Sequence, residues 1–281
     1  MKKYLVIGNP IEHSLSPMIH NYWMKKYNLI DSIYEKRKVE EKNLKDIINE
    51  IREENLVGVN VTVPFKKLII PFLDELDSTA QETKSVNTLV KIKNKIIGYN
   101  TDKPGFALTI NDLYPAKDVK AFNPIKKKTI FILGAGGVTA SIISAFKQDL
   151  VKIFLSNRTK EKANELKKIF PNIEVLDWGQ RPQNFDVVVN TTSIGLKQNQ
   201  RIDLDFSDCD KDKNKLFYDL IYNPKETNFL KEARLRGNQI KNGQKMFLNQ
   251  AMYAFKLWTN IEPEIDIEIV KLLDKWSKLE L

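Results

Sequence analysis

Apolar residues along the second half of the chain form short runs separated by amphipathic stretches. Residues 129–133 are a continuous apolar run rich in β-forming residues, as expected of a strand covered on both faces. A glycine-rich turn, a helix from about Val138 and a strand at 151–155 follow. Further strands are expected at 173–176, 186–190, 216–220 and 239–241, with a helix over 226–236 before the last. Strand–helix units of this length predict a mostly parallel, doubly wound sheet.

The N-terminal part mixes strands and helices and predicts a separate α/β domain. Strands are expected at 4–7 and 57–63, where the alternation puts Asn60 and Thr62 on the face opposite the valines. Helices are expected over 17–27, with Ser16 as the N-cap, over 43–54, and over 65–76, where Pro71 interrupts the pattern. Near the C-terminus, residues 246–260 and 265–281 predict two amphipathic helices.

A β-hairpin is predicted between residues 86 and 100, with residues 93–94 in its turn. That register pairs Asn87 with Asn100 and puts Asp102 diagonally across from Asn87 on the same face, roughly 7–8 Å away. Polar side chains at the open end of a hairpin need partners, which a polyhydroxylated ligand would supply. Asp102 could instead only cap the helix that follows.

The turn after residue 133 has the composition of a dinucleotide-binding loop. Its glycines would let the backbone approach a pyrophosphate at the N-terminus of the next helix. About 20 residues further on, an NAD site would place an acidic residue for the ribose 2′-hydroxyl. Asn157, Arg158 and Thr159 stand there instead. Because a guanidinium attracts a 2′-phosphate that a carboxylate would repel, this segment predicts NADP. Arg158 could otherwise be an ordinary solvated arginine.

The amino-acid composition limits the classes of function that the protein can have. The chain has 281 residues, with 45 Lys and Arg against 36 Asp and Glu, for a net charge of +9. The lysines are scattered, which argues against a nucleic-acid surface and suits anionic ligands. No apolar stretch approaches the ~18–20 residues of a membrane span. The lone Cys209 excludes an internal disulfide and fits a reducing compartment, and His13 and His20 have no ligand spacing that would indicate a metal site.

Several segments, in one order along nearly the whole chain, resemble the shikimate dehydrogenase family. Residues 8–21 closely match that family's N-terminal signature. The other matching segments are residues 60–66, 86–89, 100–102, 134–137, 157–159, 190–195, 219–224 and 243–250. One departure is Lys103, which stands where the family usually has glycine after its Asn-Thr-Asp motif.

The resemblance implies a two-domain α/β fold. Residues 1–104 and 245–281 would form the substrate-binding and catalytic domain, and residues 105–244 a Rossmann-like, NADP-binding domain, with the C-terminal helices returning to the first domain and a cleft between the two. The implied activity is the NADP(H)-dependent, reversible reduction of 3-dehydroshikimate to shikimate, in the pathway to chorismate and the aromatic amino acids. It further implies a cytoplasmic monomer or homodimer that acts on a small molecule, with neither nucleic acid nor membrane as a partner.

The resemblance also assigns roles, residue by residue. Lys66 and Asp102 would be catalytic, because an ammonium can stabilise the charge that hydride transfer builds on a ketone oxygen and deliver a proton to it. The implied substrate-binding residues are Ser14, Ser16, Thr62, Asn87, Asp102, Tyr222 and Gln250. The implied cofactor-binding residues are Gly134, Ala135, Gly136, Gly137, Val138, Asn157, Arg158, Thr159, Thr192, Ser193, Gly195 and Gly243, and no metal is implied.

Simpler roles and other functions stay open at this stage. Ser16 could cap a helix, Thr62 could lie on an edge strand, and Gln250 could be a satisfied amide at a helix edge. Three other functions compete: an NAD-dependent sister enzyme for quinate or shikimate, a non-catalytic ligand sensor on the same scaffold, and a basic nucleic-acid binder.

Overall fold

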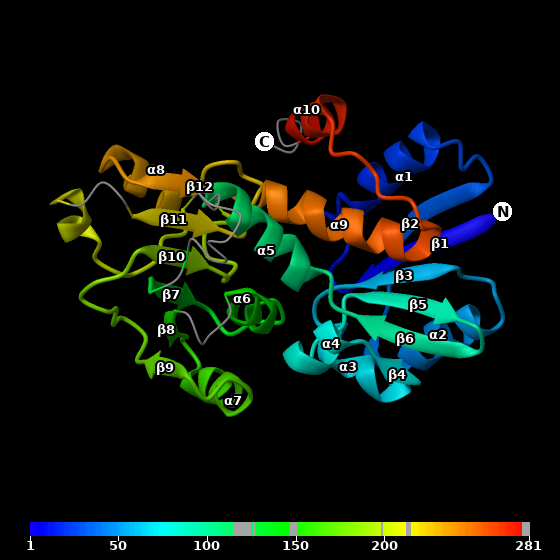
Figure 1. Cartoon of the computed structure of the whole chain (residues 1–281), viewed down its shortest axis with the longest axis horizontal. Coiled ribbons are helices and arrows are strands. Elements are labelled where there is room, and N and C mark those ends of the chain that lie inside the picture. Colours follow the sequence, from blue (N-terminus) through cyan, green and yellow to red (C-terminus); the bar gives the residue numbers. More distant parts are fainter. Residues whose placement is uncertain (115–124, 126, 147–150, 198, 212–214, 277–281) are drawn as a thin grey trace. The chain divides into compact units, whose positions relative to one another are not determined.

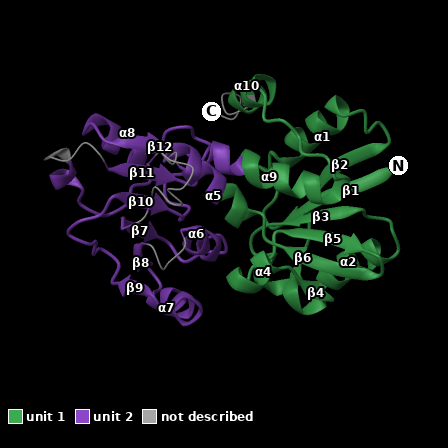
Figure 2. Cartoon of the chain, viewed as in Figure 1, with its two compact units in different colours: residues 1–106, 248–281 green, residues 107–247 purple. Residues whose placement is uncertain are grey.

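The computed structural model describes residues 1–114, 125, 127–146, 151–197, 199–211 and 215–276. The chain divides into two compact units, coloured separately in Figure 2: unit 1 comprises residues 1–106 and 248–281, and unit 2 comprises residues 107–247. Each unit is built around one six-stranded sheet with helices packed on it (Figure 1). Two α/β units of this kind confirm the predicted fold class.

The sheet of unit 1 is mixed, in the order β2-β1-β3-β5-β6-β4. Its strands are β1 (Lys2–Gly8), β2 (Ser32–Lys38), β3 (Gly58–Val61), β4 (Glu75–Leu76), β5 (Thr88–Ile92) and β6 (Lys95–Tyr99). The strands β2, β1 and β3 are parallel, whereas β5 pairs antiparallel with both β3 and β6. The predicted hairpin register is confirmed, because Thr88 pairs with Tyr99 and Ile92 with Lys95.

The helices of unit 1 contribute buried apolar side chains to its core. They are α1 (Ser16–Lys26), α2 (Leu44–Arg52), α3 (Phe65–Leu68) and α4 (Ser78–Thr83), followed by α5 (Asp102–Leu113) and α9 (Gln244–Thr259), which each continue from one unit into the other, and α10 (Ile267–Trp276). In α2, Leu44, Ile47, Ile48 and Ile51 follow the i, i+3, i+4, i+7 spacing and are all buried.

The C-terminal segment is bound to α1, which confirms the predicted return to the first domain. The indole Nε1 of Trp23 donates to the backbone oxygen of Glu264 at 3.1 Å, and the Tyr22 hydroxyl donates to the Asp266 carboxylate at 2.7 Å. Lys26 forms an ion pair with the same carboxylate at 2.5 Å. These contacts hold the chain between α9 and α10 against the helix that begins at Ser16.

Unit 2 contains the predicted doubly wound sheet. All six strands are parallel, in the order β12-β11-β10-β7-β8-β9. They are β7 (Thr129–Leu133), β8 (Lys152–Ser156), β9 (Ile173–Leu176), β10 (Val187–Asn190), β11 (Leu216–Asp219) and β12 (Gln239–Lys241), with helices α6 (Thr139–Ala145), α7 (Lys160–Ile169) and α8 (Asn228–Leu235). The strand order reverses at β7, the position where such sheets bind dinucleotides.

Two predictions about unit 1 were wrong. The stretch 65–76 is not one helix: α3 ends at Leu68, a 3₁₀ turn containing Pro71 follows, and residues 75–76 form β4. Ser16 is not an N-cap, because α1 begins at Ser16 itself and Leu15 occupies the cap position without a side-chain hydrogen bond. The Ser14 hydroxyl instead accepts the Ser16 N–H at 3.4 Å, so the local contact belongs to Ser14.

Two further elements of unit 1, β2 and α4, were not predicted from the sequence. The edge strand β2 carries mostly charged side chains and buries only Tyr34, so it shows no apolar run. The helix α4 has only six residues, most of them polar, so it shows no apolar periodicity. Asp77 is its N-cap, and the Asp77 carboxylate accepts the Thr79 N–H at 2.8 Å. The predicted C-terminal helix is described as far as Trp276, and its remaining residues lie outside the described part. No helix in the described ranges is long and apolar enough to cross a membrane.

Candidate active site

One edge of the unit 1 sheet collects most of the predicted polar residues. The parallel strands β1 and β3 end there, and the antiparallel β5 begins there. The Thr62 N–H donates to the Ile7 carbonyl at 2.9 Å, the Val61 N–H to the Asn87 carbonyl at 2.8 Å, and the Val86 N–H to the Lys66 carbonyl at 2.8 Å. The ends of three strands therefore bring Thr62, Lys66 and Asn87 to a single place.

Lys66 and Asp102 form a partly buried ion pair at this edge. The Lys66 Nζ lies 2.5 Å from Asp102 Oδ2, and the two side chains are 12% and 8% exposed. Asn87 Nδ2 donates to Asp102 Oδ1 at 3.0 Å, so both carboxylate oxygens have partners among the predicted site residues. The Lys103 N–H is instead capped by Asn100 Oδ1 at 3.1 Å. Capping α5 is therefore not the role of Asp102, which is the first residue of that helix.

A buried network of hydrogen bonds supports Asn87 from behind. Its Oδ1 accepts the Thr101 N–H at 2.8 Å, and its backbone oxygen accepts from Asn60 Nδ2 at 3.0 Å. The Tyr34 hydroxyl in turn donates to Asn60 Oδ1 at 2.6 Å. Burial raises the pKa of Tyr34 well above its usual range, while a hydrogen bond from Ser16 acts in the opposite direction. A satisfied network of this kind holds one side-chain arrangement.

The order of the strands tests the alternative that Thr62 lies on an edge strand. Because β3 lies between β1 and β5, it is a central strand and not an edge strand. Asn60 is 7% exposed and fully engaged within the sheet, whereas Thr62 follows the end of β3 and is half-buried. Of the two polar residues, Thr62 is thus the one available to a ligand.

The remaining predicted substrate residues of unit 1 lie on neighbouring segments. The loop that carries Ser14 starts at this edge, where the Asn9 N–H donates to the Val63 carbonyl at 3.0 Å. Ser16 is buried, and Ser14 is half-buried. Gln250 packs its backbone against Gly105, where an added Cβ would lie 2.8 Å from the Gln250 nitrogen. The close approach at Gly105 therefore puts Gln250 beside the first turn of α5, which carries Asp102.

In unit 2, the glycine loop has the geometry that a phosphate group needs. Gly134 has a φ of +103°, which favours glycine, and an added Cβ there would lie 2.6 Å from Thr191 Oγ1. A Cβ at Gly136 would meet nothing within 4 Å, so the backbone there faces open space. The Ala135 N–H donates to Asn157 Oδ1 at 3.0 Å, which connects the loop to the end of β8. These residues fit a dinucleotide.

Next to Asn157, the side chain of Arg158 is exposed. Its guanidinium has no ion-pair partner among the residues that the structure describes, so it is available to an anion. The other predicted cofactor residues follow β10 and β12 in the same unit: Thr192, Ser193 and Gly195 lie after β10, and Gly243 lies between β12 and α9. Tyr222 follows β11 and stacks on Phe247 with ring centroids 4.5 Å apart.

Comparison with known proteins shows the family. Residues 6–89 match the family model described as "Shikimate dehydrogenase substrate binding domain", and residues 117–228 match "Shikimate / quinate 5-dehydrogenase". A curated relative, the shikimate dehydrogenase (NADP(+)) of Pelagibacter ubique, is 52% identical over 274 residues, which are 97% of this chain and 99% of the relative. This chain belongs to the shikimate dehydrogenase family.

Solved structures of shikimate dehydrogenases have the same fold. One, determined in complex with NADP+, superimposes with a TM-score of 0.85 at 33% identity and covers 98% of this chain and 96% of that chain. The Thermus thermophilus enzyme, in complex with NADP(H) and shikimate, gives a TM-score of 0.81 at 27% identity, with 100% of both chains covered. The resemblance stated from the sequence motifs is therefore confirmed.

Two residues of the hydrogen-bond network around Asn87, Tyr34 and Thr101, were not predicted from the sequence to have a role in the site. Tyr34 lies on the unrecognised strand β2, and its only signal is that it is a lone aromatic residue in a charged run. Thr101 was seen only as part of the Asn-Thr-Asp motif, yet its hydroxyl accepts from Asn87 Nδ2 at 2.9 Å. The contact between Tyr34 and Asn60 joins strands that are distant in sequence, which a local pattern does not report. Thr101 follows the predicted hairpin, and only the role of its hydroxyl was not predicted.

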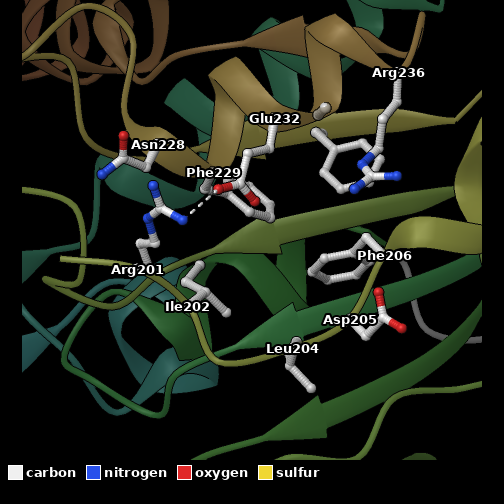
Figure 3. A pocket seen from close by; sticks show the side chains of 11 residues that line it. Arg201, Ile202, Leu204, Asp205, Phe206, Asn228, Phe229, Glu232 and Arg236 are labelled. Atoms are coloured by element: carbon white, nitrogen blue, oxygen red, sulfur yellow. Dashed lines mark ion pairs between the residues drawn. The ribbon is translucent and has the colours of Figure 1, made fainter. Parts of the chain in front are cut away.

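Figure 3 shows a separate, small pocket in unit 2. Its apolar wall includes Phe206 and Phe229, and its charged rim includes Arg201, Glu232 and Arg236. Arg201 and Glu232 form an ion pair across it at 3.8 Å. None of the predicted site residues lines this pocket, and its charges largely balance, so it gives no support to a second anion site.

Proposed function

We propose that this protein is an NADP-dependent shikimate dehydrogenase, which reversibly reduces 3-dehydroshikimate to shikimate on the pathway to the aromatic amino acids. The proposal depends mainly on the ion pair between Lys66 and Asp102, 2.5 Å apart and held by Asn87 at one edge of the unit 1 sheet. A ligand-binding module has no need of such a pair, whereas proton transfer to a ketone requires a positioned proton donor.

In the proposed mechanism, NADPH supplies the hydride. Reduction of a ketone builds negative charge on its oxygen, which the Lys66 ammonium stabilises and then protonates. Asp102 keeps the ammonium oriented through their ion pair and can accept a hydrogen bond from the neighbouring ring hydroxyl. Asn87 restrains the carboxylate by donating to its other oxygen at 3.0 Å. In the oxidative direction, Lys66 in its neutral form would accept the proton of the shikimate hydroxyl.

Substrate recognition follows from the polar groups around this pair. Ser14 and Ser16 would bind the substrate carboxylate, since both hydroxyls lie at the start of α1. Thr62 and Asn87 would bind ring hydroxyls together with Asp102. We assign Gln250 to the same task, which its position beside the first turn of α5 supports, and Tyr222 of unit 2 to a further contact with substrate.

For the cofactor, the open backbone face at Gly136 would receive the pyrophosphate, with Gly134, Ala135, Gly137 and Val138 shaping the turn. Arg158 would pair with the 2′-phosphate, flanked by Asn157 and Thr159. Thr192, Ser193, Gly195 and Gly243 would contact the nicotinamide half. The names of the relatives, which include NADP(+), support this choice of cofactor.

The test is a spectrophotometric assay of NAD(P)H formation that crosses shikimate and quinate with NADP and NAD. We expect shikimate with NADP to give the highest kcat/KM. Faster turnover of quinate with NAD would instead identify the sister activity. Absence of turnover with all four combinations, by protein that still binds shikimate, would identify a ligand-binding module and overturn the proposal.

We further propose that the enzyme acts in the cytoplasm as a monomer or homodimer. The single, buried Cys209 suits a reducing compartment. The charged side chains of the edge strand β2 disfavour extension of the sheet into a neighbouring molecule. Size-exclusion chromatography with light scattering tests the oligomeric state, and a salt-dependent DNA-binding assay tests whether the net charge of +9 has any nucleic-acid partner.

A further inference from the structure

Asp219 is a buried carboxylate for which the mechanism above has no role. It is the last residue of β11, and it is fully buried. Its Oδ1 accepts from Asn190 Nδ2 and from the Ile221 N–H, both at 3.0 Å, and its Oδ2 accepts from the Thr227 hydroxyl at 2.6 Å. No cationic side chain in the described ranges pairs with it. Burial raises its pKa to about 6, although the three hydrogen bonds act in the opposite direction.

Through Asn190, this carboxylate organises the loop after β10. Asn190 is also fully buried, and its Oδ1 accepts both the N–H of Thr192, at 3.0 Å, and the Thr192 hydroxyl, at 2.7 Å. Its Nδ2 donates to the Ile194 carbonyl at 3.1 Å as well as to Asp219. The loop is thus wrapped around one amide, whose orientation the carboxylate helps to determine.

Two glycines pack against the other partners of Asp219. Gly195 has a φ of +117°, and an added Cβ would lie 3.1 Å from Thr227 and 3.4 Å from Ile221. Gly243 donates its N–H to the Ile221 carbonyl at 3.1 Å, and a Cβ there would come within 2.0 Å of the Leu220 carbonyl oxygen. Three separate segments therefore meet around a single carboxylate.

These segments stand on one side of the position where the strand order reverses. Asn157 and Arg158 follow β8, on one side of β7, whereas Asn190 and Asp219 end β10 and β11, on the other side. A dinucleotide binds across such a reversal. If the phosphate-bearing ribose lies at Arg158, the nicotinamide half extends over the ends of β10 and β11.

We infer that Asp219 is a positioning residue for the nicotinamide half of NADP: it holds the loop of Thr192 and Gly195 and the turn before Tyr222 in the arrangement that receives the nicotinamide. This inference rests on the proposed function. A neutral amide at the same position would accept hydrogen bonds at only one of the two oxygen positions. The Asp219→Asn variant thus loosens the network while keeping the shape of the side chain.

The experiment compares two ligands by titration calorimetry: NADP, and 2′,5′-ADP, which carries the phosphate-bearing ribose without the nicotinamide. For Asp219→Asn we expect the dissociation constant of NADP to rise about tenfold, with kcat lowered by a similar factor, because misplaced binding groups weaken both. The dissociation constant of 2′,5′-ADP should stay within about twofold of the wild-type value, since the proposed contacts of this ligand lie after β8, on the other side of β7 from Asp219.

The matched control is Asp186→Asn. Asp186 directly precedes β10, at the opposite end of the same sheet, where it accepts the Thr129 N–H at 2.8 Å. This substitution should leave both dissociation constants unchanged.

Two results would overturn the inference. One is an Asp219→Asn variant with unchanged NADP affinity and kcat, and the other is an equal loss of affinity for both ligands with a lowered melting temperature, which would show a role in folding only. If the wild-type protein failed to oxidise shikimate, the proposed function would be wrong. The calorimetric comparison of NADP with 2′,5′-ADP would still test whether Asp219 positions the groups that bind the nicotinamide half.

Discussion

Lys66 and Asp102 stand 36 positions apart in the sequence, and their side chains meet at 2.5 Å. Lys66 lies in the single turn of α3, directly after the central strand β3, and Asp102 is the first residue of α5, directly after the hairpin β5–β6. The pairing of β3 with β5 therefore determines this contact.

The Lys66→Ala variant should lose catalysis and retain ligand binding. Removal of a positioned proton donor lowers kcat by roughly 10²–10⁴-fold. Shikimate affinity, measured by calorimetry, should change only a few-fold, because the other polar groups remain. The neighbouring Lys67 is exposed, so Lys67→Ala should retain wild-type kcat. Equal kcat values for the two variants would contradict the role of Lys66.

Replacing Arg158 should alter the choice of cofactor. Charge-assisted hydrogen bonds of about 1.5–3 kcal/mol with the 2′-phosphate would be lost in Arg158→Ala, so kcat/KM for NADP should fall roughly 10- to 100-fold. The value for NAD, which has no such phosphate, should change little. As a control, Arg234→Ala removes an exposed arginine that pairs with Glu226, and it should affect neither cofactor. A parallel loss with NADP and NAD would show that Arg158 does not recognise the phosphate.

Tyr34→Phe should destabilise unit 1. The variant leaves Asn60 Oδ1 buried without its donor at 2.6 Å, which costs about 1–3 kcal/mol in the free energy of unfolding. Tyr4 is the residue paired with Tyr34 on the adjacent strand, and it is 2% exposed. No hydrogen bond between its hydroxyl and another described residue is seen, so Tyr4→Phe should cost less. Urea denaturation of both variants measures the difference, and equal losses would argue against the network.

His20 should make the protein sensitive to acid. It is fully buried, stacks on Tyr34 with centroids 4.3 Å apart, and neither ring nitrogen has a hydrogen-bond partner among the described residues. Burial lowers its pKa from 6.5 to about 3. Between these two pKa values the folded state therefore binds fewer protons than the unfolded chain. As a result, His20 does not reduce the free energy of unfolding above about pH 6.5, and it reduces that free energy increasingly as the pH falls toward 3.

The corresponding variant is His20→Leu, which cannot take up a proton. At about pH 5 the wild-type protein should have lost about 2 kcal/mol of unfolding free energy through His20, relative to neutral pH. The difference in stability between the two proteins should thus shift in favour of the variant on acidification. A difference that is the same at both pH values would show that His20 does not titrate in the unfolding transition.

Most of unit 2 could be predicted from the sequence because its strands are continuous apolar runs. Strand 129–133 was predicted at its observed position and strand 187–190 to within one residue, since a parallel strand that is covered on both faces is a continuous apolar run without polar alternation. In unit 1 the edge strand β2 was missed, because only Tyr34 of its seven residues is buried. The helix predicted over 65–76 was wrong because its apolar spacing comes from a short turn and from β4.

The sequence by itself determined the order of the elements, the hairpin register that brings Asn87 to Asp102, and the set of motifs that identifies the family. These are properties of neighbouring residues, and they depend on local periodicity and turn chemistry. Only the tertiary structure decided that Tyr34 supports Asn60 and that Asp219 joins three segments of unit 2. Such contacts arise when strands distant in the chain pack side by side, and a buried polar group takes whichever partner that packing brings within reach.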